Sequence, residues 1–202
     1  MIRNVIFDMG NVLINFDPAH FIRRAGITDP QDAQMLLREV FSSHEWKGQD
    51  IGDLAEAQVE AGVLARLPER LHDAAHRLIF AWDDPIEPID GMEQLIRDCK
   101  SAGMGVYLLS NASVRQREYW NRVPGHELFD GVEVSAFLRM VKPDPKIFLY
   151  VLDKYHLNAG ECLFVDDSMP NVTGAESVGM RGHHFRGDTD ALRRCIFSGG
   201  AQ

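Results

Sequence analysis

Polar side chains that could bind a phosphate group and a divalent cation follow three short apolar runs of this sequence. Asp8 comes after Val5–Phe7, Ser110 and Asn111 come after Val106–Leu109, and Asp166 and Asp167 come after Leu163–Val165. A further candidate, Lys142, lies just before an expected helix start at Pro145. Magnesium prefers oxygen ligands and usually takes one or two carboxylates together with phosphate oxygens and water. Hydroxyl, amide and ammonium groups are suited to the phosphate itself.

Three carboxylates at one edge of a sheet would repel one another, because Lys142 alone cannot balance their charge. Without a cation we therefore expect at least one of them to have a raised pKa. Asp8 is the first residue to consider, since it ends the first apolar run. A single Asp at a strand end is also typical of a turn in which the side chain bonds its own backbone. The functional interpretation therefore depends on the other polar residues lying close to Asp8.

A parallel sheet would bring these strand ends to one edge, where ligands of open α/β sheets bind. From Asp90 onward, helix and strand patterns alternate as a doubly wound sheet requires. Further strands are expected at Val132–Val134 and near His183–Phe185. The sequence therefore predicts an α/β fold with a doubly wound, Rossmann-like parallel sheet.

A block of helical patterns separates the first strand from the rest of the chain. Two helices are expected to start at the Asp-Pro pairs 17–18 and 29–30, a weaker third over 51–59, and a fourth over 71–82. We expect residues 16–84 to form a small all-helical cap, and residues 1–15 with 85–202 to form the α/β core. The last residues, 198–202, are expected to be frayed.

Composition and charge narrow the classes of function. The chain has 202 residues, 45% of them hydrophobic and 25% charged, which is typical of a globular protein with a sizeable core. A net charge of −9 without a long basic run argues against nucleic acid or an anionic membrane as the main partner. Three widely spaced cysteines favour a reducing compartment, and the N-terminal apolar run is too short for a signal peptide or membrane span. We therefore expect a cytoplasmic enzyme or binding protein.

Four segments resemble, in order, the four motifs of the haloacid dehalogenase-like hydrolase superfamily. They are FDMGNVL around Asp8, LLSN ending at Asn111, Val141-Lys142-Pro143, and FVDDSMPN around Asp166 and Asp167. The resemblance covers essentially the whole chain, because residues 16–84 are similar to the helical C1-type cap of the family's phosphatases. It implies a magnesium-dependent phosphatase that acts on a small phosphorylated metabolite.

The resemblance also implies a role for each motif residue. Asp8 would be the nucleophile and a metal ligand, the Gly10 carbonyl and Asp167 would be further metal ligands, and Asp166 and Asn171 would be ligands or neighbours of ligands. Ser110, Asn111 and Lys142 would hold the phosphate. A carboxylate is a weak nucleophile, but a bridging magnesium ion removes charge repulsion and aligns the attack on phosphorus. An aspartyl-phosphate on Asp8 would form, and water would then hydrolyse it.

One position departs from the family's phosphatase pattern. Those enzymes usually carry a second Asp two residues after the nucleophile, as general acid and base, where this chain has Gly10. Sugar 1-phosphates need less help, because an anomeric hydroxyl is a better leaving group than an ordinary alcohol. DMGNV also resembles the branch that contains bacterial α-D-glucose-1-phosphate phosphatase, which shares the glycine. His20, Asp17 or Asn11 could replace the missing acid, although each also fits a helix-start, cap or loop role.

Two other segments and two other functions allow more than one interpretation. His183 and His184 would face opposite sides of a strand, so we interpret them as structural. Residues 44–48 could form a polar-aromatic loop that closes over the site, or an ordinary surface turn. A haloacid dehalogenase would use Asp8 on carbon without metal, but has no use for the Asp166–Asp167 pair. A protein that binds a phosphorylated ligand without turnover would be consistent with Gly10.

Overall fold

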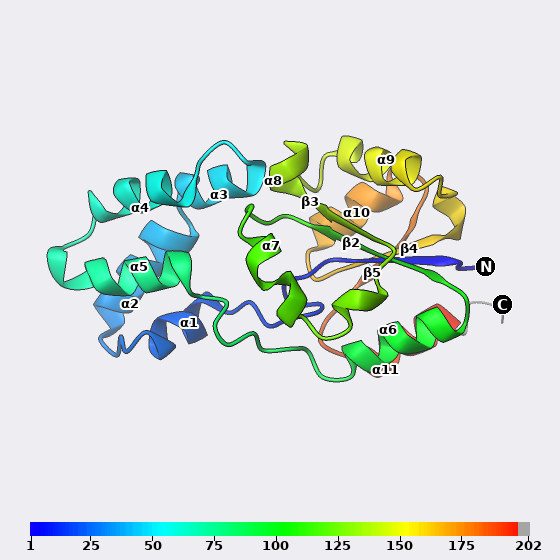
Figure 1. The fold of residues 1–202 in the computed structure, drawn as a ribbon, viewed down its shortest axis with the longest axis horizontal. Coiled ribbons are helices and arrows are strands. Elements are labelled where there is room, and N and C mark those ends of the chain that lie inside the picture. The colour runs from blue at the N-terminus through cyan, green and yellow to red at the C-terminus, as the bar shows by residue number, and fades with distance from the viewer. Residues whose placement is uncertain (198–202) are drawn as a thin grey trace.

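The computed structural model describes residues 1–197, so the segment expected to be frayed, 198–202, lies outside the described residues. A sheet flanked by helices forms one end of the molecule, and helices α1 to α5 form the other (Figure 1). The strands are β1 (Asn4–Phe7), β2 (Gly105–Ser110), β3 (Gly131–Val134), β4 (Cys162–Asp166) and β5 (Arg181–His184). The helices around the sheet are α6 (Met92–Ser101), α7 (Gln116–Tyr119), α8 (Ser135–Leu138), α9 (Pro145–Lys154), α10 (Met169–Glu176) and α11 (Thr189–Phe197).

The sheet is parallel, with the strand order β3-β2-β1-β4-β5. β1 lies in the middle, where Phe7 pairs with Leu108 of β2 and with Val165 of β4. The residues that follow these partners therefore lie at one edge of the sheet, beyond the carboxyl ends of the strands. Asp8, Ser110 and Asp166 lie at this edge. This arrangement confirms the predicted α/β class and parallel topology.

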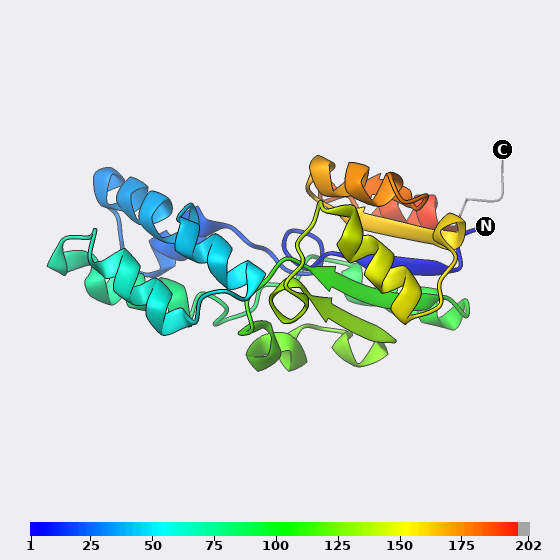
Figure 2. The ribbon, with the colours of Figure 1, turned by 90° about the horizontal axis from the view of Figure 1, so that it is seen from above.

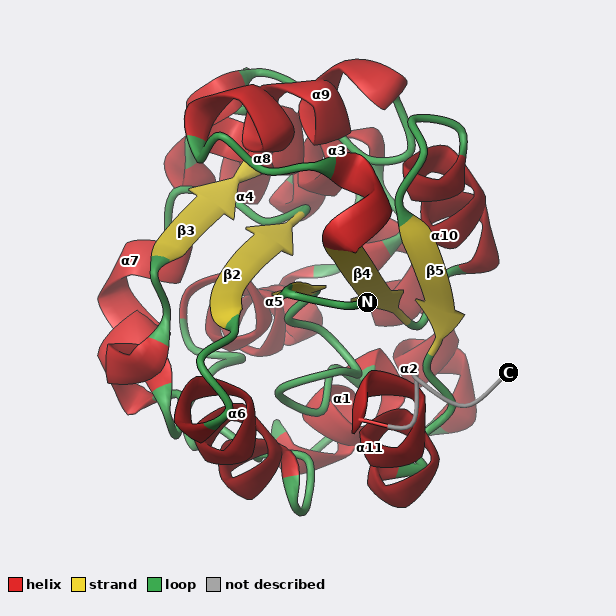
Figure 3. Cartoon of the chain, turned by 90° about the vertical axis from the view of Figure 1, so that its right-hand side faces the viewer, coloured by secondary structure: helices red, strands yellow, loops and turns green. Residues whose placement is uncertain are grey.

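Alternate residues of the central strands pack on opposite faces of the sheet. Val5 and Phe7 belong to a core shared with α6 and α11, whereas Ile6 belongs to a second core shared with α9 and α10. Figure 3 shows these two helix pairs on opposite sides of the strands. Because both faces are covered, the strands are apolar throughout and polar residues are confined to their ends.

The helical segment, residues 16–84, follows β1 and contains no strand (Figure 2). Its helices are α1 (Pro18–Arg24), α2 (Pro30–Leu36, which continues as a π-helical turn over Leu37–Phe41), α3 (His44–Ile51), α4 (Glu56–Leu64) and α5 (His72–Phe80). Asp17 and Asp29 cap the first two helices, as their sequence patterns predict. No helix among residues 1–197 is long and apolar enough to cross a membrane.

The prediction of a single third helix over 51–59 was wrong, since two helices occupy this region. Gly52 ends α3 in a left-handed conformation with φ of +81°, and Ala55 begins the next helix with its backbone N–H bonded to the Gln58 side chain. The loop or turn expected at residues 44–48 is part of α3. The Ser43 hydroxyl caps this helix by accepting a 3.0 Å hydrogen bond from the Trp46 backbone.

The helical segment leaves and rejoins the sheet portion at neighbouring points. The Asn15 N–H donates to the Glu87 carbonyl at 2.7 Å, and the Ile89 N–H donates to the Leu13 carbonyl at 2.9 Å. A further contact joins α3 to α8, because the Ser135 hydroxyl donates to the Asp50 carbonyl at 2.5 Å. This contact holds the C-terminal end of α3 over the edge of the sheet where the strand-end residues lie.

Candidate active site

The three strand-end carboxylates converge, as their positions after neighbouring strands predict. Asp8, Asp166 and Asp167 each offer an oxygen that lies within 4.8 Å of the others. The Asp8 backbone N–H continues the pairing of β1 with β4 by donating to Val165 at 2.8 Å. Asp8 and Asp166 are buried, whereas Asp167 is partly exposed.

Lys142 lies in the loop before α9 and reaches into this cluster. Its ammonium Nζ is 2.7 Å from Asp8 Oδ1 and 2.7 Å from Asp166 Oδ2, and its side chain is only 1% exposed. Burial would lower the pKa of Lys142, but the two adjacent carboxylates outweigh burial and raise it. Lys142 is therefore a buried cation held between two anions.

Asp8 has the raised pKa expected of a carboxylate cluster. The pKa of Asp8 is raised to about 6, chiefly by burial; Lys142 lowers this pKa and the charge of Asp166 raises it. Three carboxylates and one ammonium group leave excess negative charge, and a divalent cation would neutralise it.

Asp166 differs from the other two carboxylates in its hydrogen bonds. Its oxygens accept from the Ser168 backbone at 2.8 Å, from Asn171 Nδ2 at 3.1 Å on each oxygen, and from Lys142 Nζ at 2.7 Å. An ionised carboxylate has about four lone-pair positions, so these donors occupy the whole group. Asp166 is therefore arranged to orient Lys142, while Asp8 and Asp167 keep oxygen positions that a cation can use.

The donor set fits a hard divalent cation. Asp8 and Asp167 supply carboxylate oxygens, and both line one cavity together with Gly10. Asn11 Nδ2 donates to Asp167 Oδ2 at 3.0 Å, which leaves the other Asp167 oxygen available. Two carboxylates and a carbonyl match the partial oxygen coordination that magnesium accepts.

Ser110 and Asn111 lie beside this cluster at the end of β2, and both line the cavity. The Asn111 side chain donates from Nδ2 to the Lys142 carbonyl at 2.9 Å and accepts from the Lys142 N–H at 2.9 Å. Asn111 thus fixes the backbone that carries Lys142. An amide nitrogen has two N–H bonds, so the second N–H of Asn111 can still meet a phosphate oxygen.

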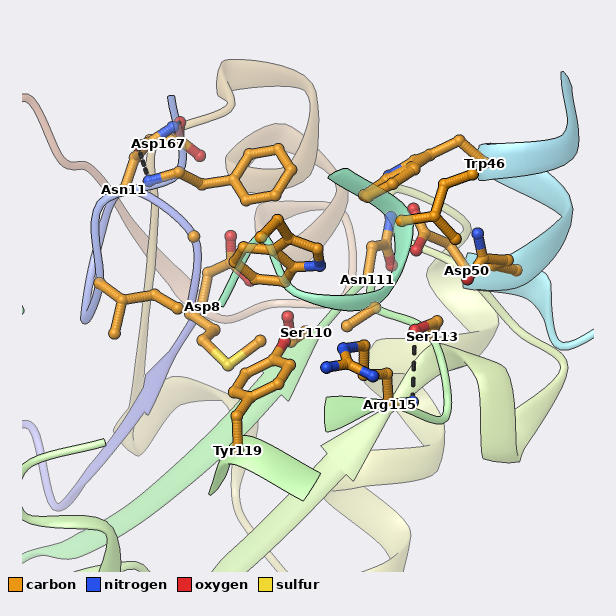
Figure 4. Close-up of a pocket in the computed structure, with 18 residues that line it drawn as sticks. Asp8, Asn11, Trp46, Asp50, Ser110, Asn111, Ser113, Arg115, Tyr119 and Asp167 are labelled. Atoms are coloured by element: carbon orange, nitrogen blue, oxygen red, sulfur yellow. Dashed lines mark hydrogen bonds between the residues drawn. The ribbon is translucent and has the colours of Figure 1, made fainter. Parts of the chain in front are cut away.

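The cavity above these residues has a volume of about 250 Å³ and lies between the sheet edge and the helical segment. Figure 4 shows Asp8 on one side and Trp46 and Asp50 of α3 on the other. Much of the wall is aromatic, because Phe16 packs edge-on against Trp82 at 5.0 Å between ring centroids, and Trp82 against Tyr119 at 5.3 Å. Trp82 and Tyr119 therefore pack against each other and also line the cavity.

Two charged residues of the cavity were missed in the sequence. Arg115 donates from Nε to the buried Asp83 at 2.9 Å. Asp50 lies near the end of α3, where the pKa of its carboxyl is raised to about 7. Burial is the main cause, the charge of Asp8 also raises this pKa, and Lys142 lowers it. No local motif marks Asp50, because its position depends on how α3 packs on α8.

The three residues considered as replacements for the missing acid occupy different places. His20 Nε2 lies 2.9 Å from Glu87, and Asp17 caps α1; neither lines the cavity. Asn11 does line it, but its amide is bonded to Asp167 and to the Phe16 backbone. His183 and His184 also lie outside the cavity wall, with His184 Nε2 bonded to the Asp167 carbonyl at 2.9 Å.

Comparison with known proteins agrees with this geometry. The family model of haloacid dehalogenase-like hydrolases matches residues 2–179. The sesquiterpene phosphatase astK of Aspergillus oryzae is 31% identical over 96% of this chain and 93% of that protein. A phosphorylated carbohydrates phosphatase of Thermotoga maritima is 24% identical over 87% of this chain and 81% of that protein.

The fold has solved counterparts. A haloacid dehalogenase family enzyme of Bacteroides thetaiotaomicron, in complex with magnesium and inorganic phosphate, superposes with a TM-score of 0.66 at 22% identity, over 93% of this chain and 96% of that one. This likeness concerns the fold, whereas the family model and the Aspergillus relative concern the sequence over nearly its whole length. The chain therefore belongs to the haloacid dehalogenase-like hydrolases.

Proposed function

We propose that the chain is a magnesium-dependent phosphatase that transfers the phosphoryl group of a small phosphate monoester to Asp8 and then to water. The observation that carries this proposal is that Asp8 and Asp167 line one cavity, while the buried Lys142 lies behind the cavity wall and contacts Asp8. A carboxylate nucleophile, a cation site and a fixed positive charge are what phosphoryl transfer to an aspartate requires.

Each residue then has a role that follows from its contacts. Magnesium bound by Asp8, Asp167 and the Gly10 carbonyl would supply positive charge to the phosphoryl oxygens. Lys142 and the Ser110 hydroxyl would bind those oxygens, and Asn111 would both position Lys142 and donate its remaining N–H. Asp166 would hold the Lys142 ammonium in place. Asp8 would attack phosphorus, and water would hydrolyse the aspartyl-phosphate.

The helical segment, residues 16–84, is proposed to act as a cap that selects the alcohol part of the substrate. Phe16, Trp46, Ile79 and Trp82 come from this segment or its connection and line the cavity. Such walls favour an alcohol with an apolar face over a highly charged one. By name, the Aspergillus relative is a sesquiterpene phosphatase and the Thermotoga relative is a phosphorylated carbohydrates phosphatase, so both apolar alcohol phosphates and sugar phosphates are candidates. The similarity to glucose-1-phosphate phosphatase stays a prediction.

A phosphate-release screen tests this function. Prenyl phosphates and sugar phosphates, including glucose 1-phosphate, would be incubated with the protein in magnesium and in EDTA. We expect release only with magnesium, and faster release from prenyl phosphates because of the aromatic wall. Asp8→Asn should lower kcat/KM by at least about 10³-fold, since an amide cannot replace the carboxylate that is proposed to accept the phosphoryl group. Asp53→Asn is the matched control, because Asp53 is exposed and lies outside the cavity.

Four results would contradict the proposal. Release that persists in EDTA, or in the Asp8→Asn variant, would remove the metal or the nucleophile from the mechanism. Halide release from haloacids without metal would identify a dehalogenase. Tight binding of phosphorylated ligands without release would identify a binding protein in which Gly10 marks the loss of turnover.

A further inference from the structure

The leaving alcohol needs a proton that position 10 cannot provide. When Asp8 attacks phosphorus, the bond to the alcohol oxygen breaks on the opposite side, because attacking and leaving atoms are roughly in line. The alkoxide of an ordinary alcohol is strongly basic, so a proton donor on that side accelerates the step. Gly10 has no side chain, so a side chain that donates this proton to an ordinary alcohol has to come from another part of the cavity wall.

Asp50 lies on that side of the cavity. It belongs to the last turn of α3 and lines the same cavity as Asp8, across the site from it (Figure 4). Its backbone is fixed to the sheet portion, because the Ser135 hydroxyl donates to the Asp50 carbonyl at 2.5 Å and accepts from the Ala112 N–H at 3.0 Å. Asp50 is therefore held at a defined distance from the ends of β2 and β3.

The surroundings of Asp50 favour a carboxyl that keeps its proton near neutral pH. Burial is the main cause of its raised pKa, and the negative charge of Asp8 adds to it. Lys142 acts in the opposite direction, and Arg115, Tyr119 and Asp167 are the other titratable groups of the cavity wall. An exposed Asp would be ionised under these conditions and could not donate.

Gln49, the residue before Asp50, gives independent support for a ligand at this wall. Its side-chain Nε2 is buried and finds no hydrogen-bond partner within residues 1–197, although Gln49 lines the cavity. A buried amide donor without a partner is costly, and a substrate oxygen at this position would satisfy it.

We propose that Asp50 is the general acid and base of the reaction and replaces the carboxyl group missing at position 10. The assignment rests on the proposed phosphatase function. In the first step Asp8 bonds to phosphorus, the phosphorus–oxygen bond to the alcohol breaks, and the Asp50 proton passes to the leaving oxygen. In the second step the Asp50 carboxylate takes a proton from water as that water attacks phosphorus, and Asp8 leaves as a carboxylate. The neutral Asp50 is thereby restored.

The leaving group offers a direct test. Wild type, Asp50→Asn and the control Asp53→Asn would be assayed in magnesium with an alkyl phosphate and with p-nitrophenyl phosphate. The nitrophenolate ion is a good leaving group without protonation, whereas an alkoxide needs a proton to leave readily. We expect Asp50→Asn to lower kcat/KM for the alkyl phosphate by about 10²–10⁴-fold, and for p-nitrophenyl phosphate by less than about tenfold. Asp53→Asn should match wild type with both substrates.

Retained activity on p-nitrophenyl phosphate also shows that the Asp50→Asn variant is folded. Equal losses on both substrates would assign Asp50 a structural role, and no loss on either would exclude it as the acid; both results overturn the assignment. Failure of the underlying phosphatase function looks different, because wild type and Asp8→Asn would then release phosphate equally from p-nitrophenyl phosphate.

Discussion

Lys142 shows how single residues balance charge at this site. Its ammonium group contacts Asp8 and Asp166 at equal distances, and almost none of it is exposed to solvent. A buried charge is tolerated only when it is paired and hydrogen-bonded, and removal of one partner leaves the other uncompensated. The three side chains therefore depend on one another.

Replacement of Lys142 by methionine should lower both stability and activity. We expect the free energy of unfolding at pH 7 to fall by about 3 kcal/mol, because two buried carboxylates lose their shared cation. The pKa of Asp8 should rise further, since Lys142 opposes its upward shift. Urea unfolding in EDTA, followed by tryptophan fluorescence, measures the stability. Lys146→Met is the control, since Lys146 is exposed in the next helix; equal stability of the two variants would contradict the argument.

Sequence patterns located the strand-end residues because the causes are local. An apolar run that ends in Asp8, Ser110 or Asp166 predicts both a strand and the position of its carboxyl end. In a parallel sheet these carboxyl ends lie at the same edge. Asp50 and Arg115 carry no comparable local signal. Their place in the cavity depends on tertiary packing of α3 and of the segment after β2, and one sequence does not define that packing.

At the scale of elements, the contact between α3 and α8 determines where Asp50 lies. Gly52, which ends α3, has a φ of +81°, and a Cβ atom on it would approach the Ala136 carbonyl oxygen to 2.2 Å. Only glycine permits both the left-handed backbone and this close approach. The apolar spacing of the sequence predicted a helix across Gly52, although a glycine at this position is also typical of a helix end.

Gly52→Ala should therefore displace the end of α3. Gly26→Ala is a matched control, because Gly26 has a φ of +87° but nothing within 4 Å of an added Cβ. In both variants, a residue with a Cβ atom adopts a left-handed backbone conformation, which lowers the free energy of unfolding by about 1–2 kcal/mol. Gly52→Ala should lose at least about 1 kcal/mol more through overpacking, together with phosphatase activity that Gly26→Ala retains. Thermal unfolding and phosphate release measure both effects; equal behaviour of the two variants would show that the contact is unimportant.

At the scale of the whole molecule, buried carboxyls connect stability to pH and to metal. The folded state raises the pKa of Asp8 to about 6 and of Asp50 to about 7, whereas an unfolded Asp titrates near 4. Between these values the folded chain binds more protons than the unfolded chain. The two carboxyls thus make their full contribution to the free energy of unfolding below about pH 4. This contribution is lost as the pH rises to about 7.

In EDTA, the ionisation of these two carboxyls should lower the melting temperature as the pH rises from about 4 to about 7. Magnesium should raise the melting temperature more at pH 8 than at pH 5, because it binds ionised carboxylates. Asp50→Asn should weaken the pH dependence in EDTA relative to Asp53→Asn. Calorimetric scans across this pH range provide the measurement, and identical pH profiles for the two variants would contradict the argument.

The neighbouring exits of the helical segment have a consequence for how such enzymes diversify. Asn15 and Glu87 are hydrogen-bonded neighbours, so a different insertion of any length could be spliced between them while the strands keep their register. In this molecule, however, such an exchange would carry away Asp50 as well as the aromatic wall. Substrate preference and proton donation would then be inherited together. A lineage that changed its insertion would need a general acid at another position.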